Sequence, residues 1–295
     1  MSKKEMLMNL ARPVNRPVTR RILKRHYSAD LDLTSVEEEK KVLVLAPHMD
    51  DETIGPGATL RKHAEHGAEV HCLFITDGGG SVSDLSEEEL KQSRKEEIHQ
   101  VMDILKLSDV SYMDLPDGGV SSSQENIQLL KQKIEEVDPD VIYTTPYVDA
   151  HTDHTATAQL LADTLKQVND FNGIVRMYEI NCAFPPDFIN CLIDTSDQYG
   201  KKVQATEVFA SQAIAFDGFL ELNQLKGNLA KSPVQSAEGF IQLDKDAFIK
   251  HCETLKEKEI NFPKTFKQVN RTDTLLWAIF KNYDQKKDFY RHTIQ

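Results

Sequence analysis

The sequence predicts an α/β protein with a Rossmann-like three-layer fold, a mostly parallel sheet, and helical extensions at both ends. Two observations carry this prediction. Short apolar runs rich in β-branched residues recur along the 295-residue chain, and stretches with helical periodicity separate them between residues 42 and 168. Regular alternation of strands and helices is typical of parallel sheets whose two faces are both covered by helices.

The first expected strand runs from Lys41 to Ala46, where the sequence KVLVLA is apolar without alternation. Continuous runs of this kind are typical of strands that are buried on both faces of a sheet. Similar runs predict further strands at 70–76, 110–113, 141–145, 174–180 and 191–194.

Helices are expected between these strands. The clearest spans 87–106, because Ser86 and Glu89 have the spacing of a capping box and apolar residues then recur at helical intervals. Apolar faces of helical period predict other helices at 57–66, 127–137, 155–168, 199–215 and 274–283.

No linker, internal repeat or low-complexity tract divides the chain, so we expect one domain with terminal appendages. We assign residues 1–38 to a basic N-terminal extension and residues 39–245 to the main body. Residues 246–295 are expected to form a helical C-terminal extension that packs on the same body.

The net charge of −12 disfavours nucleic acid as a partner, because the phosphate backbone is itself a polyanion. The charge is uneven, since residues 1–28 contain eight basic residues and one acidic residue. We expect this segment to form a solvated arm or to pack on the acidic body. It could also contact an anionic membrane surface, and either extension could form a homo-oligomer contact.

The chain contains no run of about 20 apolar residues, the length that crosses a bilayer, and its first apolar segment is too short for a secretory signal. Its four cysteines are widely spaced and include no Cys-x-x-Cys pair. This usage favours a reducing compartment over a disulfide scaffold, so we expect a cytoplasmic protein.

Two polar clusters follow the first and the fourth of the expected strands. The first reads Pro-His-Met-Asp-Asp-Glu over residues 47–52, and the second reads His-Thr-Asp-His over residues 151–154. Ligands of open parallel sheets bind at the carboxyl ends of the strands, so we expect the two clusters to meet at one edge of the sheet.

Two histidines and one carboxylate from two loops match a catalytic zinc site, which uses three protein ligands and keeps a position open for water. We predict His48, Asp51 and His154 as these ligands. Fe²⁺ or another divalent cation also suits this donor set. Asp50 would remain free to take a proton from the water as a general base.

His151, oriented by Asp153 or another carboxylate, could stabilise an oxyanion or protonate a leaving amine. The acidic pair has a structural alternative, in which Asp51 or Thr53 caps the helix expected at 57–66. The seven other histidines have no polar cluster beside them, so we assign them to packing or to the surface.

Together, the motifs Pro47-His48-Met49-Asp50-Asp51-Glu52 and His151-Thr152-Asp153-His154 resemble those of the LmbE-like, or PIG-L, family of zinc-dependent N-acetyl sugar deacetylases. Met49 stands where the family usually has proline. Weaker matches, such as Thr76-Asp77-Gly78 and Pro116-Asp117-Gly118, extend the resemblance over about residues 40–240.

The resemblance implies a Rossmann-like α/β domain, zinc at His48, Asp51 and His154, and Asp50 as the base. It also implies His151 as the stabilising or acid group, and substrate contacts by Asp117 and Arg94. Both of these last residues also have ordinary structural explanations, since Asp117 lies in a Pro-Asp-Gly turn and Arg94 is three residues from Glu97.

We therefore expect a metal-dependent hydrolase that removes the acetyl group from an N-acetylated amino sugar or a lipid- or nucleotide-linked glycoconjugate precursor. An amide hydrolase acting on a non-sugar substrate would share every motif. A nucleotide-binding protein is a weaker alternative, because the glycine pattern after the first strand fails at Leu60. The last alternative is a binding protein without catalytic activity.

Overall fold

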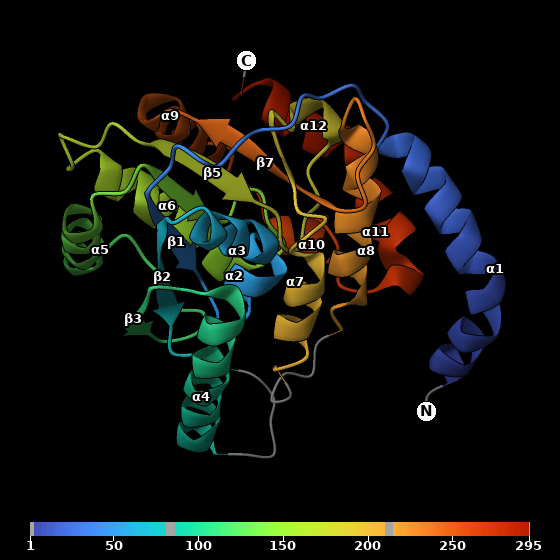
Figure 1. Ribbon diagram of the computed structural model, residues 1–295, viewed down its shortest axis with the longest axis horizontal. Helices are drawn as coiled ribbons and strands as arrows, with labels where there is room; N and C mark the ends of the chain where they lie inside the picture. The colour runs from blue at the N-terminus through green and yellow to red at the C-terminus, as the bar shows by residue number, and fades with distance from the viewer. Residues whose placement is uncertain (1–2, 81–85, 210–214, 295) are drawn as a thin grey trace.

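The computed structural model describes residues 3–80, 86–209 and 215–294. A sheet lies at its centre (Figure 1). It has seven strands in the order β3-β2-β1-β4-β5-β7-β6. The strands are β1 (Lys41–Ala46), β2 (Glu69–Thr76), β3 (Asp109–Leu115), β4 (Val141–Thr144), β5 (Ile174–Tyr178), β6 (Cys191–Asp194) and β7 (Ala237–Leu243). The first five are parallel, whereas β7 runs antiparallel to both β5 and β6.

Helices cover both faces of this sheet. One layer contains α2 (Asp51–Ile54), α3 (Gly57–Glu65), α4 (Glu87–Leu105) and α7 (Tyr199–Thr206), and the other contains α5 (Gln124–Val137), α6 (Thr152–Leu165) and α9 (Lys245–Lys256). The predicted α/β class with a mostly parallel sheet is therefore confirmed. Every residue of β1 after Lys41 is buried, as its unbroken apolar sequence predicts.

The predicted elements up to residue 168 lie close to where the structure has them. The capping box is present, because the Ser86 hydroxyl accepts from the Glu89 backbone N–H and the Glu89 side chain accepts from the Ser86 backbone N–H. The Asp51 side chain does not cap a helix. It lies in the first turn of α2 instead, and the residue before it, Asp50, makes no side-chain capping bond.

Later elements differ more from prediction. The helix expected at 199–215 ends at Thr206 in α7, and residues 210–214 of that range lie outside the described part of the chain. The helix expected at 274–283 is two helices, α11 (Leu275–Phe280) and α12 (Tyr283–Arg291). Asn282, with a φ of 54°, separates them because a left-handed residue cannot continue an α-helix. Strand β7, α8 (Asp217–Lys226) and α10 (Phe262–Thr265) had no sequence prediction.

The basic N-terminal segment forms a helix, α1 (Lys3–His26), that runs along one side of the molecule next to α8 and α11 (Figure 1). Arg12 and Arg16 pair with Asp273 at 2.8 and 3.2 Å, and Arg20 pairs with Glu221 at 2.5 Å. Packing on the acidic body, one of the two expected states of this segment, is thus the one observed for the described side chains.

Within the described residues, none of the helices combines the length and the hydropathy of a membrane-crossing segment.

Candidate metal centre

The site lies where the sheet changes direction. From β1 the chain moves outward through β2 to β3, and it then returns to place β4 on the other side of β1. The loops that leave the carboxyl ends of β1 and β4 therefore diverge and open a crevice between them. Residues 47–51 come from the first loop, and residues 145–154 come from the second loop and the first turn of α6.

Three predicted ligands meet in this crevice. His48 Nδ1 lies 3.2 Å from Asp51 Oδ2, His154 Nε2 lies 3.2 Å from the same oxygen, and the two nitrogens are 3.3 Å apart. Donors about 2.0–2.1 Å from a tetrahedral zinc ion are separated by roughly 3.3–3.4 Å. The triangle therefore has the size that a zinc ion requires, and its donor set also suits Fe²⁺.

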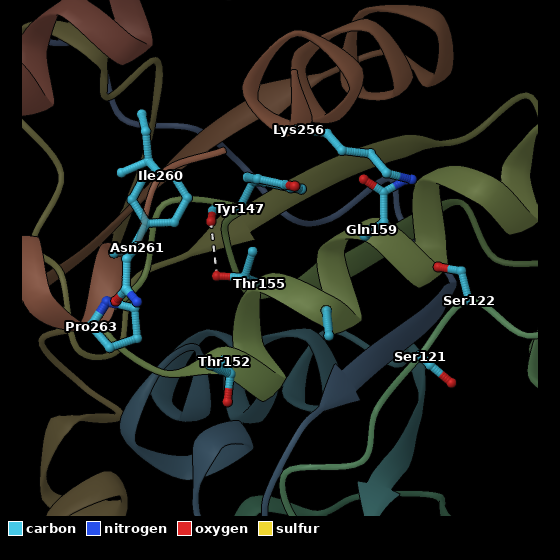
Figure 2. A pocket seen from close by; sticks show the side chains of 12 residues that line it. Ser121, Ser122, Tyr147, Thr152, Thr155, Gln159, Lys256, Ile260, Asn261 and Pro263 are labelled. Atoms are coloured by element: carbon cyan, nitrogen blue, oxygen red, sulfur yellow. Dashed lines mark hydrogen bonds between the residues drawn. The ribbon is translucent and has the colours of Figure 1, made fainter. Parts of the chain in front are cut away.

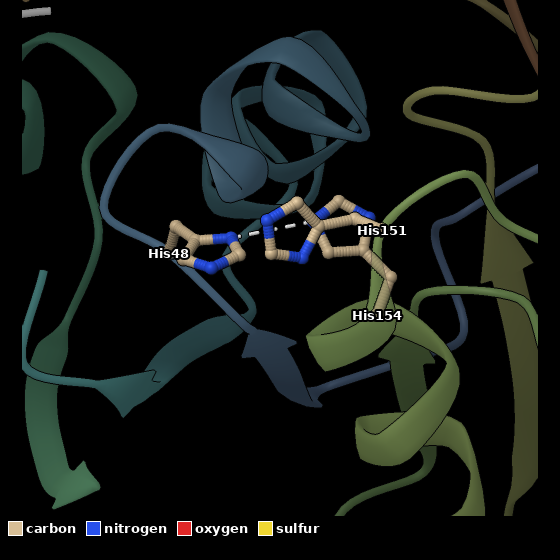
Figure 3. Close-up of side chains that lie close together, drawn as sticks. All are labelled: His48, His151 and His154. Carbon is tan, nitrogen blue, oxygen red and sulfur yellow. Dashed lines mark hydrogen bonds between the residues drawn. The ribbon is translucent and has the colours of Figure 1, made fainter. Parts of the chain in front are cut away.

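Figure 3 shows the rings of His48, His151 and His154 gathered between the loop after β1 and the start of α6. Ligand atoms of these three histidines, and of His48 with Asp117 and Asp153, lie within 4.8 Å of one another. In the second group, the 3.8 Å between His48 Nε2 and Asp117 Oδ1 is longer than any edge of the His48–Asp51–His154 triangle. We prefer the triangle because each of its edges matches a tetrahedral ligand pair.

The surroundings of the two ligand histidines favour positive charge. Burial by itself lowers the pKa of His48, but hydrogen bonds with Asp153 and Asp51 outweigh it and raise that pKa to about 9. Burial also opposes protonation of His154, yet the charges of Asp51 and Asp149 hold its pKa well above the ordinary value. The same carboxylates would stabilise a divalent cation between the rings.

Asp149 and Asn181 orient His154, and sequence reasoning assigned neither a role. Asp149 Oδ1 lies 3.2 Å from His154 Nδ1, and both carboxylate oxygens accept from Asn181, at 2.8 Å from Nδ2 and 3.0 Å from the backbone N. Asp149 is fully buried. A carboxylate on the distal nitrogen of a ligand histidine fixes its tautomer and ring orientation. In the sequence, only the position of Asp149 just before the second motif could have indicated this role.

Asp50 faces the pocket without joining the triangle. Its residue is 6% exposed, and burial together with the charge of Asp51 raises the pKa of Asp50 to about 7. A buried carboxyl with a raised pKa in a cleft is a candidate proton acceptor and donor.

His151 is the residue before α6, and its ring is partly exposed. Its Nδ1 accepts from the Asp153 backbone N–H at 3.2 Å, so in the neutral ring Nε2 carries the proton. The Asp153 carboxylate is 3.9 Å from His151 Nδ1. It accepts instead from the Gly118 N–H at 2.8 Å and lies 3.3 Å from His48 Nε2. The structure thus places Asp153 against His48 more closely than against His151.

Asp117 and Arg94 also line this pocket, which has a volume of about 390 Å³. Asp117 Oδ2 accepts from the Gly80 N–H at 2.6 Å, and its other oxygen lies 3.8 Å from His48 Nε2. Arg94 is 3% exposed and reaches the pocket from α4. A Cβ atom at Gly78 would lie 2.9 Å from the Arg94 side chain, so the loop after β2 fits against this arginine only with glycine there. All eight site residues named from the sequence line this one pocket.

Comparison with known proteins identifies a matching family and similar folds. Residues 43–165 match the model of the PIG-L family, described as GlcNAc-PI de-N-acetylase. The solved structure of N,N'-diacetylchitobiose deacetylase from Pyrococcus horikoshii superimposes with a TM-score of 0.63 at 24% identity, covering 84% of this chain and 96% of that one. At this identity the likeness shows the fold.

Four relatives are similar in sequence. The diacetylchitobiose deacetylase of Thermococcus kodakarensis is 31% identical over 121 residues, which are 39% of this chain and 45% of that protein. A probable N-acetyl-alpha-D-glucosaminyl L-malate deacetylase of Bacillus anthracis is 23% identical, over 60% of this chain and 83% of its own length. The 4-oxalmesaconate hydratase of Pseudomonas putida is 23% identical, over 66% of this chain and 83% of its own length. A fourth relative, the 1D-myo-inositol 2-acetamido-2-deoxy-alpha-D-glucopyranoside deacetylase of Kineococcus radiotolerans, is 35% identical over 29% of this chain and 26% of its own length. The chain thus spans less than half the length of this relative and of the Thermococcus protein.

Proposed function

The chain belongs to the PIG-L, or LmbE-like, deacetylase family, and from this premise we propose that it is a metal-dependent hydrolase that removes the acetyl group from an N-acetylated amino sugar or sugar conjugate. The observation that carries the proposal is the triangle of His48 Nδ1, Asp51 Oδ2 and His154 Nε2, with the Asp50 carboxyl beside it in the same pocket.

His48, Asp51 and His154 would hold the metal ion, for which zinc is our first choice and Fe²⁺ the second. In such a site zinc makes water a nucleophile near neutral pH and polarises the amide carbonyl. Three ligands leave the side that faces the pocket open to water and substrate.

Asp50 takes the proton from the attacking water. Its raised pKa suits this role, because a base that titrates near pH 7 can accept a proton and later return it. As the carbon–nitrogen bond breaks, the leaving nitrogen receives a proton from Asp50 or His151, and the products are acetate and an amine.

His151 stabilises the negative charge that develops on the carbonyl oxygen. Since Nδ1 accepts from the Asp153 backbone N–H, the Nε2–H is available to donate to this oxygen. Asp153 is a positioning residue, because the contact of 3.3 Å between its Oδ2 and His48 Nε2 holds the His48 ring in place. Asp117 and Arg94 bind substrate hydroxyl groups, and their position in the lining of the same pocket supports this role.

Acetate release from a panel of N-acetyl amino sugars and conjugates tests this proposal, comparing zinc-loaded protein, chelated protein and Asp50→Asn. Release by the loaded wild-type protein alone is expected. Acetate release from non-sugar amides only would favour the alternative amide hydrolase. Because one relative is a hydratase, addition of water to an unsaturated carboxylic acid with no acetate release would overturn the deacetylase proposal.

We also propose the boundaries given above, with residues 39–245 as the deacetylase domain and residues 246–295 packed on it, in a cytoplasmic protein whose four cysteines are buried and free. The outer face of α1 is proposed to contact an anionic membrane surface. Aliphatic side chains there are exposed by 71% at Val14, 49% at Val18 and 41% at Ile22. Exposed basic residues accompany them on the same helix, namely Arg21, Lys24 and Arg25.

A further inference from the structure

A second pocket adjoins the candidate metal centre. Its volume is about 440 Å³, within the range of small-molecule sites. Thr152 lines both pockets, and the loop after β3 contributes Gly118 to the first and Ser121 to the second. The two pockets therefore share a lining residue and a loop.

One face of α6 forms the floor of this pocket. Thr152, Thr155, Ala156 and Gln159 all line it, and their spacing of three, four and seven residues puts them on the same side of a helix. Because a helix rises 1.5 Å per residue, this floor is about 10 Å long. It begins at the residue after His151, so it leads directly away from the proposed chemistry.

The C-terminal extension forms the facing wall. In Figure 2, Ile260 and Pro263 lie across the pocket from Thr155. Phe262, 3% exposed, packs its ring edge-on against Tyr147 with 6.1 Å between centroids. These side chains make the wall apolar.

Hydrogen bonds fix both sides of the pocket. Asn261 accepts with its side chain from the Lys264 backbone N–H at 3.1 Å, which caps α10 and holds the 260–263 segment. The Thr155 hydroxyl donates to the Tyr147 carbonyl at 3.0 Å, a bond visible in Figure 2. The pocket is therefore preformed, and a ligand does not have to order its walls.

Polar side chains also line the pocket, namely Ser121, Ser122, Thr152, Thr155, Gln159, Lys256 and Asn261. Of these, Gln159 is buried. Its amide nitrogen donates to Asp163 Oδ2 at 2.8 Å, whereas its buried Oε1 has no hydrogen-bond partner among the described residues.

We propose that this pocket binds an apolar substituent of the amide substrate, of about six carbon atoms or one aromatic ring. The inference rests on the proposed function, since it gives that substrate an extended apolar part. An amino sugar alone would leave this second pocket unfilled. Its facing wall lies outside residues 43–165, the segment that matches the family model, so the C-terminal extension selects the substrate.

The substituent can be attached at either end of the amino sugar. It is an aglycone on the glycosidic oxygen, or it is an acyl chain longer than acetyl on the nitrogen. Two ligand pairs separate these sources: hexyl and methyl glycosides of N-acetylglucosamine, and N-hexanoyl- and N-acetylglucosamine.

The first experiment measures binding of these four compounds to the metal-free, full-length protein by calorimetry, so that it does not depend on catalysis. In one pair, the six-carbon member is expected to bind at least about tenfold more tightly than its short counterpart, since each buried methylene contributes up to about fourfold. Ala156→Phe, which fills the floor of the pocket, should reduce this ratio to about one. Gln100→Phe, at an exposed position on α4 outside the pocket, should retain the ratio.

Equal binding of long and short members in both pairs, or no measurable binding of either six-carbon compound, overturns the proposal. So does a preference that survives in Ala156→Phe. Tighter binding of a six-carbon compound without hydrolysis of any amide by the zinc-loaded protein would instead refute the proposed function and leave the pocket assignment standing. Hydrolysis of every amide without a preference for long substituents would refute the pocket assignment and support the proposed function.

Discussion

The Asp149 carboxylate lies 3.2 Å from Nδ1 of His154, while Nε2 of the same ring points at Asp51. This contact decides which nitrogen of His154 faces the candidate metal centre. The same carboxylate also joins the loop after β4 to the loop after β5, because Asn181, which follows β5, donates to it twice. The geometry of the site thus depends on a residue that would not itself touch a metal ion.

Asp149→Asn should weaken zinc binding about 10–100-fold, as expected when the carboxylate behind a ligand histidine is lost. Competition with a chromophoric chelator measures this affinity. Asp140→Asn is a suitable control, since Asp140 accepts from the Lys40 and Lys41 backbone N–H groups away from the site. Unchanged zinc affinity in Asp149→Asn would contradict the orienting role.

His151→Ala should lower kcat by about 10²–10³, the usual cost of removing one oxyanion donor, and leave zinc affinity close to that of the wild-type protein. Steady-state kinetics and the same chelator competition give the two values. The exposed His99 provides the control variant His99→Ala. Loss of zinc affinity in His151→Ala would mean that the ligand set is His48, His151 and His154, and that our assignment of Asp51 is wrong.

Lys202→Met should destabilise the protein by about 3–5 kcal/mol, because it leaves a buried carboxylate without its counterion. Lys202 Nζ lies 2.5 Å from Glu238 Oε1, and both residues are almost fully buried. Glu238 also accepts from the Ala58 and Thr59 N–H groups at the start of α3. Urea unfolding of the single variant and of Lys202→Met/Glu238→Gln provides the measurement. The double variant should be more stable than the single one, and the opposite order would show that burial of Glu238 alone is not costly.

His251→Gln should make the protein less sensitive to acid. Burial lowers the pKa of His251 to about 3, so the unfolded chain binds more protons than the folded one between pH 3 and 6.5, and the free energy of unfolding falls as pH drops below 6.5. At pH 5 this group accounts for a loss of about 2 kcal/mol. Urea unfolding at pH 7.5 and pH 5 measures the fall in the free energy of unfolding, which should be smaller in the variant by this amount. His99→Gln should keep the wild-type difference, and an unchanged difference in His251→Gln would refute the assignment.

Binding of the full-length protein to phosphatidylserine-containing vesicles should be detectable by sedimentation and should weaken as salt is added, because exposed charges are screened. Replacing Arg21, Lys24 and Arg25 with glutamate should abolish it. The same change in charge at Lys201, Lys250 and Lys258, which lie on exposed positions elsewhere, is the control. Equal loss in both variants would indicate a response to net charge and not a membrane face on α1.

Local pattern was sufficient for the part of the fold that carries the chemistry. The unbroken apolar sequence of β1 marks a strand buried on both faces, and the capping box at Ser86 marks the start of α4. The same local reasoning failed at β7, because Glu238 and Gly239 interrupt its apolar run. Burial of Glu238 is compensated by the ion pair with Lys202, from α7, and by the Ala58 and Thr59 N–H groups.

The sequence by itself determined the α/β alternation and the two polar motifs, since strand and helix periods and the position of a motif after a strand are properties of neighbouring residues. The tertiary structure decided that Asp149 and Asn181 stand behind His154 and that Asp153 lies against His48. It also decided that residues 260–263 line the pocket next to the candidate metal centre. These contacts join segments far apart in the chain. They follow from how helices and loops pack on the sheet, which no local pattern specifies.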